Sequence, residues 1–77
     1  MRVARFDYYQ QGRQPERGPD FPRHQLTLDD EIAYFKRYER LESVDLLPSS
    51  FPVLARAVLH LEGQPPLTIV MRDCGSY

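Results

Sequence analysis

The residues best suited to chemistry in this 77-residue chain are His24, His60, Cys74 and the acidic run Asp29-Asp30-Glu31. A cysteine–histidine pair can act as nucleophile and base, but it needs a third orienting group and a pocket. The two histidines and the cysteine do not follow the paired spacing of zinc ligands. We therefore expect no catalytic site, metal or cofactor, and we expect the protein not to be an enzyme.

The acidic run has a structural explanation. On a helix, three consecutive side chains point in directions about 100° apart, so their carboxylates do not converge. In the first turn of a helix, negative charge is stabilised by the helix dipole. His60 falls on the polar side of an expected strand, where a solvent-facing histidine is the simplest interpretation.

Composition and charge narrow the class of protein. A single cysteine excludes a disulfide within the chain and suits a reducing compartment. No apolar run reaches the length of a signal-peptide core or a membrane helix, so we expect a cytoplasmic protein without a membrane partner. The net charge is −1, although residues 1–25 hold five Arg against three acids, a local balance of +2.

The first half of the chain predicts one strand and one helix. In the stretch RVARFDYY, apolar residues alternate with polar ones, which is typical of a strand. Thr27 is a suitable N-cap for a helix ending near residues 41–43. Leu28, Ile32 and Phe35 share one side of that helix and should be buried against a sheet.

The second half predicts a connector and a hairpin. SVDLLPSSFP (43–52) is interpreted as a connector, with its two leucines packed on the core. Residues 53–62 fit either a strand or a helix. The following LTIVMR is strand-like, and the short EGQPP between the two runs favours a β-hairpin. Residues 73–77 are expected to form a loose C-terminal tail.

These elements predict the fold class. We expect an α+β two-layer sandwich, with one helix packed on a three- or four-stranded antiparallel sheet, in the order β-arm-α-β-β. The whole chain, residues 1–77, is expected to form a single small domain, because its length leaves no room for a second core.

The arm, residues 11–25, holds three Pro, two Gly and three Arg. It cannot bury enough apolar surface to offset its own ordering, and its prolines stiffen it. We expect a contact element anchored by Phe21, with a short return strand near its end that Pro22 confines to a sheet edge. The arm's arginines should reach acidic groups, either on a partner or in the Asp29-Asp30-Glu31 turn. The alternative is that the arm is slack.

Aromatic residues are abundant, with five Tyr, four Phe and no Trp. Three of the phenylalanines are expected in the core, whereas the tyrosines are too many to bury in so small a protein. They either line a binding surface, since interfaces favour Tyr and Arg, or cover the margin of the core. The expected core phenylalanines are Phe6, Phe35 and Phe51, and the tyrosines are Tyr8, Tyr9, Tyr34, Tyr38 and Tyr77.

The leading functional hypothesis is a non-enzymatic module that binds a larger protein, an adaptor or inhibitor such as phages and mobile elements encode. The alternative is an accessory protein that binds nucleic acid through its Arg- and Tyr-rich N-terminal region, which the pI near 6.1 disfavours. A homodimer through Tyr34, Tyr38 and Leu41 is also expected, unless the loop holding Leu46 and Leu47 covers these side chains. The candidate binding residues are Tyr8, Tyr9, Arg13, Arg17, Phe21, Arg23, Tyr34 and Tyr38.

Overall fold

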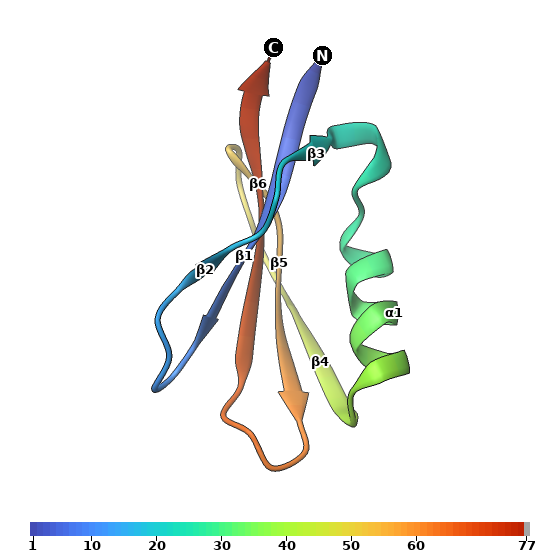
Figure 1. Ribbon diagram of the computed structural model, residues 1–77, viewed down its shortest axis with the longest axis vertical. Helices are drawn as coiled ribbons and strands as arrows, with labels where there is room; N and C mark the ends of the chain where they lie inside the picture. The colour runs from blue at the N-terminus through green and yellow to red at the C-terminus, as the bar shows by residue number, and fades with distance from the viewer. Residues whose placement is uncertain (77) are drawn as a thin grey trace.

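An antiparallel sheet of six strands carries one helix on one of its faces (Figure 1). The computed structural model describes residues 1–76. Along the chain the elements are β1 (Arg2–Gln10), β2 (Glu16–Arg17), β3 (Phe21–Pro22), the short 3-10 helix η1 (Arg23–Gln25), α1 (Leu28–Tyr38), β4 (Leu41–Leu47), β5 (Val53–Leu61) and β6 (Leu67–Ser76).

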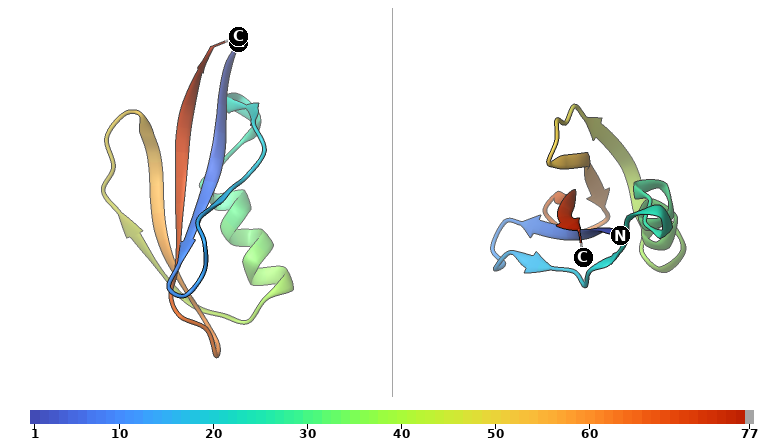
Figure 2. Two further views of the ribbon diagram at one scale, coloured as in Figure 1. Left: turned by 60° about the vertical axis from the view of Figure 1, so that its left-hand side comes forward. Right: turned by 90° about the horizontal axis from the view of Figure 1, so that it is seen from above.

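The strands follow the order β2-β1-β6-β5-β4, and β3 pairs with β1 beside β2. The longest pairing joins the two ends of the chain, with Arg2 opposite Ser76 and Gln10 opposite Leu67. Figure 2 shows that the sheet is strongly twisted and that α1 packs on one side of it. The expected α+β class is confirmed, but the sheet has six strands rather than three or four.

The core lies between α1 and the sheet. Ala4 and Phe6 alternate along β1 with residues of the other face, and both are buried in one cluster with the apolar residues of β5 and β6. Leu28, Ile32 and Phe35 pack against this cluster, as the helical periodicity predicts. They are only half-buried, however, and no residue of α1 is fully buried. A single helix with open space on both sides cannot enclose its apolar side completely.

The start of α1 follows from its cap. The backbone N–H of Asp30 donates a 3.1 Å hydrogen bond to Oγ1 of Thr27, which satisfies one of the free donors of the first turn. The helix ends at Tyr38, before the expected 41–43, because Leu41 already pairs with Leu61 as the first residue of β4.

The expected connector at 43–52 is wrong over its first half, which belongs to β4. Val44 lies opposite Leu59 and Leu46 opposite Ala57. The expected burial of Leu46 is also wrong, because this side chain is 69% exposed near the end of β4. Leu47 is half-buried. Phe51, expected in the core, is 66% exposed in the segment between β4 and β5.

The hairpin prediction for residues 53–62 and LTIVMR is confirmed. β5 and β6 pair from Val53 opposite Arg72 to Leu59 opposite Leu67. Gly63 adopts a φ of +73°, which residues with a side chain rarely adopt, and Gln64 N–H donates to the Leu61 carbonyl to close the turn. The helical alternative for this segment is therefore excluded.

The loose tail expected at 73–77 is wrong for residues 73–76, which continue β6, and Tyr77 lies outside the described residues. Asp73 holds this end in place. Its side chain is only 1% exposed and accepts hydrogen bonds from Arg2 at 2.9 and 2.5 Å and from Arg23 at 3.3 Å. The Arg2 hydrogen bond lowers the pKa of Asp73, against the opposing effect of burial.

The arm folds back along β1. The Gly18 N–H donates a 2.6 Å hydrogen bond to the Phe6 carbonyl, and β3 pairs with β1 through Pro22 opposite Val3. The return strand expected in FPRHQL (21–26) is confirmed only at Phe21–Pro22, because Arg23–Gln25 form η1. A Cβ at Gly18 would lie 2.8 Å from the Phe6 oxygen, so glycine permits this close approach.

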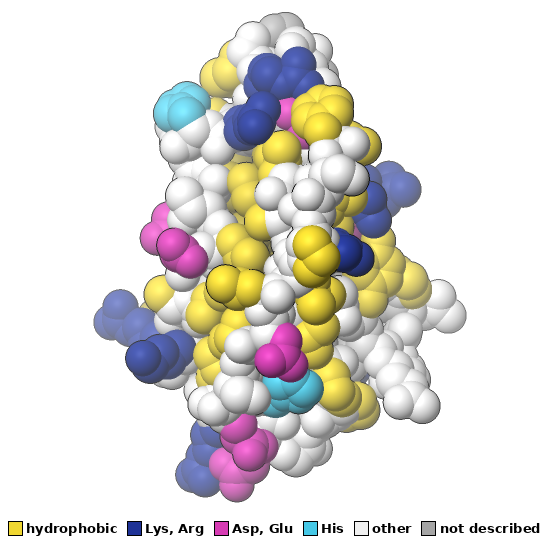
Figure 3. All heavy atoms as spheres, turned by 180° about the vertical axis from the view of Figure 1, so that it is seen from behind, with side chains coloured by type: hydrophobic (Ala, Val, Ile, Leu, Met, Phe, Trp, Pro, Cys, Tyr) yellow, Lys and Arg dark blue, Asp and Glu magenta, His cyan; other side chains and the backbone are white. Residues whose placement is uncertain are grey.

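Among residues 1–76, no helix covers the sheet face opposite α1. Figure 3 shows hydrophobic side chains along the middle of that side of the molecule, with charged side chains around them. Arg5 and Arg72 lie opposite each other here and both bind the buried carboxylate of Asp7, at 2.9 and 2.7 Å. The Tyr9 hydroxyl accepts a further hydrogen bond from Arg72 at 3.1 Å.

Candidate functional site

A cleft separates α1 from the arm, with β1 as its floor. It comprises two cavities, and Tyr8, Glu31 and Tyr34 line both. The Phe21 pocket has a volume of about 620 Å³ and is bounded by Gly18, Pro19 and Phe21 of the arm. The Arg13 pocket, of about 310 Å³, lies toward the hairpin turns and is bounded by Arg13, Gln14 and Glu16. Together the two form the arm–helix cleft.

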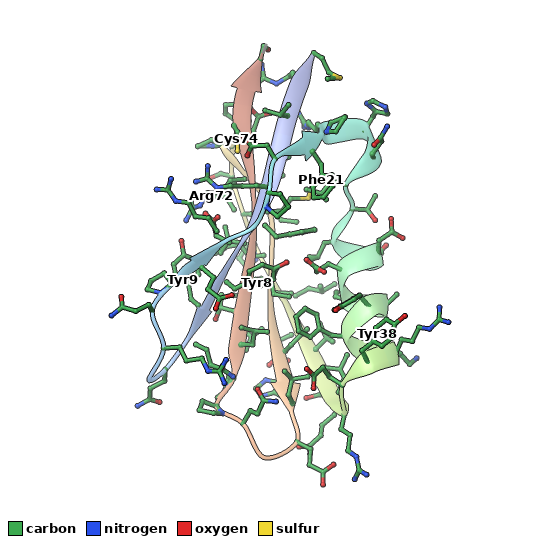
Figure 4. The ribbon with its side chains drawn as sticks, in the orientation of Figure 1. Tyr8, Tyr9, Phe21, Tyr38, Arg72 and Cys74 are labelled. Carbon is green, nitrogen blue, oxygen red and sulfur yellow. The ribbon has the colours of Figure 1, made fainter. Side chains whose placement is uncertain are left out.

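Side chains along β1 alternate between the two faces of the sheet, so Tyr8 lies on the same face as Phe6 and lines this cleft. Figure 4 shows Tyr8 and Phe21 between the strands and the helix, whereas Tyr9 and Arg72 lie toward the other side of the sheet. From α1, Glu31 and Tyr34 are three residues apart and therefore share one side of the helix. The helix start set by Thr27 thus determines which side chains form this wall.

A hydrogen bond joins the floor of the cleft, on β1, to its helical wall, on α1. The Tyr8 hydroxyl donates to the carboxyl group of Glu31. Burial raises the pKa of Tyr8 above its usual value, and the hydrogen bond and the charge of Glu31 raise it further. The phenol is therefore a hydrogen-bond donor at neutral pH and is not suited to act as a base.

Aromatic rings continue from the floor of the cleft to the surface of the helix. Ring centroids are 6.5 Å apart between Phe6 and Tyr8, 6.5 Å between Tyr8 and Phe35, and 5.7 Å between Phe35 and Tyr34. Tyr34 and Tyr38 follow at 4.9 Å. These separations lie within the range of favourable aromatic pairs. The Tyr34 and Tyr38 rings are exposed, so the row ends at solvent.

The charged groups lining the cleft are mainly acidic. The Phe21 pocket has Asp30 and Glu31 at its wall and no basic side chain. The Arg13 pocket has one arginine against three glutamates, Glu16, Glu31 and Glu39. An apolar floor with acidic walls suits a ligand that is both apolar and positively charged, because aromatic rings and carboxylates both attract cations.

Half of the candidate binding residues from the sequence meet in this cleft. These are Tyr8, Arg13, Phe21 and Tyr34. The others lie elsewhere: Tyr9 faces the opposite side of the sheet, Arg17 is exposed on β2, Arg23 binds Asp73, and Tyr38 lines neither pocket.

The structure corrects two further expectations. Arg23 does not reach the Asp29-Asp30-Glu31 turn but pairs with Asp73 of β6. The alternative to the dimer, in which a loop holding Leu46 and Leu47 covers Tyr34 and Tyr38, is wrong, because both leucines lie in β4 and both tyrosines are exposed. Glu31 also lines the cleft but was not among the candidate residues, because its position in the first helical turn already explained it. Its spacing of three residues from Tyr34 is the signal that could have identified it.

The arginines of the N-terminal region mostly bind carboxylates of the chain itself. Arg2 and Arg23 share Asp73, and Arg5 binds Asp7. These ion pairs neutralise much of the positive charge that a phosphate backbone would need. Nucleic-acid binding therefore stays a prediction that this arrangement does not favour.

His24, His60 and Cys74, the residues first considered for catalysis, lie apart from one another and line neither pocket of the cleft. The ring of His60 pairs with Asp45 at 2.8 Å on the face opposite α1, and His24 is exposed in η1. Cys74 is half-buried beside Arg5, and burial raises the pKa of its thiol. Within residues 1–76, no group of three His, Cys, Asp or Glu side chains is arranged to hold a metal ion.

Comparisons with protein-family models, with curated proteins and with solved structures found no match. Within residues 1–76, no helix is both long and apolar enough to span a membrane.

Proposed function

We propose that this protein is a non-enzymatic binding module, an adaptor or inhibitor, and that its arm–helix cleft docks on an apolar, basic segment of a larger protein. The observation that carries this proposal is the convergence of Tyr8, Phe21 and Tyr34, from three separate elements, on one cleft with acidic walls. Tyrosine is enriched among the residues that dominate binding energy at protein interfaces.

The shape and charge of the cleft define the partner. Apolar side chains of the bound segment replace water against the Tyr8 and Tyr34 rings. A lysine or arginine of the segment lies near Asp30 or Glu31, where the carboxylates and the aromatic faces both stabilise a cation. Charge complementarity of this kind mainly speeds association and selects among partners.

Capture from a cell lysate with matched variants tests the proposal. The bait proteins are the unchanged chain, Tyr34→Ala and Tyr38→Ala, each with nuclease treatment, and bound proteins are identified by mass spectrometry. Both tyrosines are exposed on α1, four residues apart, but only Tyr34 lines the cleft. We expect a stoichiometric protein that binds the unchanged chain and Tyr38→Ala and is lost with Tyr34→Ala.

Two outcomes contradict the proposal. In the first, no stoichiometric protein binds the unchanged chain. In the second, Tyr34→Ala retains the captured protein as well as Tyr38→Ala does, which places binding outside the cleft. A partner lost only after nuclease treatment indicates nucleic-acid binding instead.

A further inference from the structure

The Arg13 pocket is apolar where it meets the core. Leu61 and Leu67 line it and belong to the buried cluster between α1 and the sheet. The rings of Tyr8, Tyr34 and Phe35 line it as well. Phe35 pairs with both tyrosines, and its ring plane is inclined by 56° to that of Tyr8 and by 85° to that of Tyr34. The three rings therefore form an angled wall instead of one flat stack.

Three carboxylates surround this aromatic wall, and each comes from a different place in the fold. Glu16 belongs to β2, Glu31 to the first turn of α1, and Glu39 follows the last residue of that helix. Glu31 and Glu39 are eight residues apart, which is about 12 Å along the helix axis. Within residues 1–76, none of the three forms an ion pair, either with Arg13 or with another base. The pocket is thus an apolar cavity with unpaired negative charge around it.

We propose that the Arg13 pocket binds the methylated ammonium group of a lysine on the segment that occupies the arm–helix cleft. This inference rests on the proposed function and specifies the side chain that determines its selectivity. A methylated ammonium is both cationic and apolar, so ring faces and carboxylates stabilise it together. Its quaternary form has no N–H, so no donor is left without a partner against Leu61 and Leu67.

An arginine fits this pocket less well. The guanidinium is a flat fork that binds most strongly to a carboxylate with two free oxygens. One oxygen of Glu31 already accepts the hydrogen bond of the Tyr8 hydroxyl. Glu16 and Glu39 are exposed, and a direct ion pair with an exposed carboxylate contributes little. An ammonium is a compact charge whose attraction depends less on direction, so carboxylates on several sides can act on it together.

Binding of capped single amino acids tests the proposal without a partner protein. The probes are N-acetyl methylamides of trimethyllysine, of lysine, of arginine, and of the neutral isostere in which carbon replaces the trimethyllysine nitrogen. Amide NMR shifts of the protein are followed at constant ionic strength. We expect trimethyllysine to bind roughly fivefold more tightly than its neutral isostere, the factor for a partly exposed cation over aromatic rings. It should also bind more tightly than lysine or arginine, with its largest shifts at Tyr34, Phe35 and Glu39.

Matched variants locate the bound cation. Glu39→Gln and Tyr34→Leu should each weaken the binding of trimethyllysine more than that of the neutral isostere. Glu42→Gln and Tyr38→Leu change exposed residues that do not line the pocket, so they should leave both affinities unchanged. Arg13→Gln should strengthen the binding of trimethyllysine, because it removes a positive charge from the pocket.

Three results overturn the proposal. The first is equal affinity for trimethyllysine and its neutral isostere, and the second is tighter binding of arginine than of trimethyllysine. The third is choline binding as tightly as the capped trimethyllysine, which assigns the pocket to a free small cation. If these probes fail while Tyr34→Ala still abolishes protein capture, the ammonium site is wrong and the proposed function stands. If the probes bind as expected and no protein is captured, the proposed function fails and the ammonium site stands.

Discussion

The hydroxyl of Tyr8 on β1 donates a hydrogen bond to the carboxyl group of Glu31 on α1, and this contact joins the sheet to the helix in the middle of the arm–helix cleft. Tyr8→Phe removes the hydroxyl and keeps the ring. We expect a loss of about 1 kcal/mol in the free energy of unfolding, as for a partly exposed hydrogen bond. The melting temperature should fall by roughly 4–8 °C. Tyr34→Phe is the control, because its ring is exposed.

The raised pKa of Tyr8 predicts how stability depends on alkaline pH. The folded state holds the phenolic proton more tightly than the unfolded state does. This contribution to stability is fully present below the usual tyrosine pKa of about 10 and is lost as the pH rises toward the folded value. In an absorbance titration of tyrosinate, one tyrosine should ionise later than the others, and Tyr8→Phe should remove that step. If the variant keeps the late step, the environment assigned to Tyr8 is wrong.

Asp73 predicts the opposite dependence at acid pH. Its pKa is lowered mainly by the hydrogen bond from Arg2. The stability it contributes is therefore present above the usual carboxylate pKa and is lost as the pH falls through the lower folded value. Asp73→Asn should lower the melting temperature at pH 7 and reduce the loss of stability on acidification. Glu42→Gln, on an exposed residue of β4, is the control. Equal acid profiles for the unchanged chain and Asp73→Asn would contradict the structure.

Partial burial of the helix predicts a graded series of alanine variants. Phe6 is buried on the sheet, Phe35 is half-buried under α1, and Tyr38 is exposed. Phe6→Ala should cost about 3–5 kcal/mol of stability, the usual range for a buried phenylalanine. Phe35→Ala should cost about 1–2 kcal/mol, because less apolar area is removed from water on folding. Tyr38→Ala should change stability by about 0.5 kcal/mol or less. Chemical denaturation measures all three, and an equal cost at Phe6 and Phe35 would mean that the helix is more deeply packed than described.

Gly18 predicts that the arm is part of the cleft rather than slack. The added Cβ in Gly18→Ala would lie 2.8 Å from the Phe6 carbonyl oxygen, so the arm must move away from β1. We expect a loss of stability of about 1–3 kcal/mol, the range for an added methyl group in a closely packed place. Gln11→Ala, on an exposed residue of the same arm, should have little effect. A Gly18→Ala variant as stable as the Gln11→Ala variant would show that the arm does not pack on β1.

Local patterns in the sequence predicted the helix and the hairpin. Thr27 and the acidic residues after it mark the start of the helix. The spacing of Leu28, Ile32 and Phe35 shows which side of the helix faces the sheet, so both features can be predicted from local sequence alone. The β5–β6 hairpin is similarly indicated by two apolar runs with a short turn between them. For these elements, the residues that define the structure are neighbours in the chain.

The parts that the sequence did not predict depend on contacts between distant residues. In β4, Leu46 and Leu47 are consecutive and break the alternation of a strand, and the segment is ordered by pairing with β5. The end of β6 is held by Asp73, whose partner Arg2 is 71 positions away in the chain. The location of the cleft could not be predicted for the same reason. The aromatic character of Tyr8, Phe21 and Tyr34 suggested a binding role, but these residues come together only in the folded protein.

The central claim is that the arm–helix cleft binds an apolar, basic segment. The most direct measurement selects short random peptides displayed on phage against the protein and maps the tightest synthetic peptide by amide NMR shifts. We predict that the selected peptides combine aromatic or aliphatic residues with Lys or Arg. The largest shifts should then fall on Tyr8, Glu31 and Tyr34, and Tyr34→Ala should weaken binding where Tyr38→Ala does not. Acidic peptides, or shifts confined to the face of Tyr9 and Arg72, would contradict the claim.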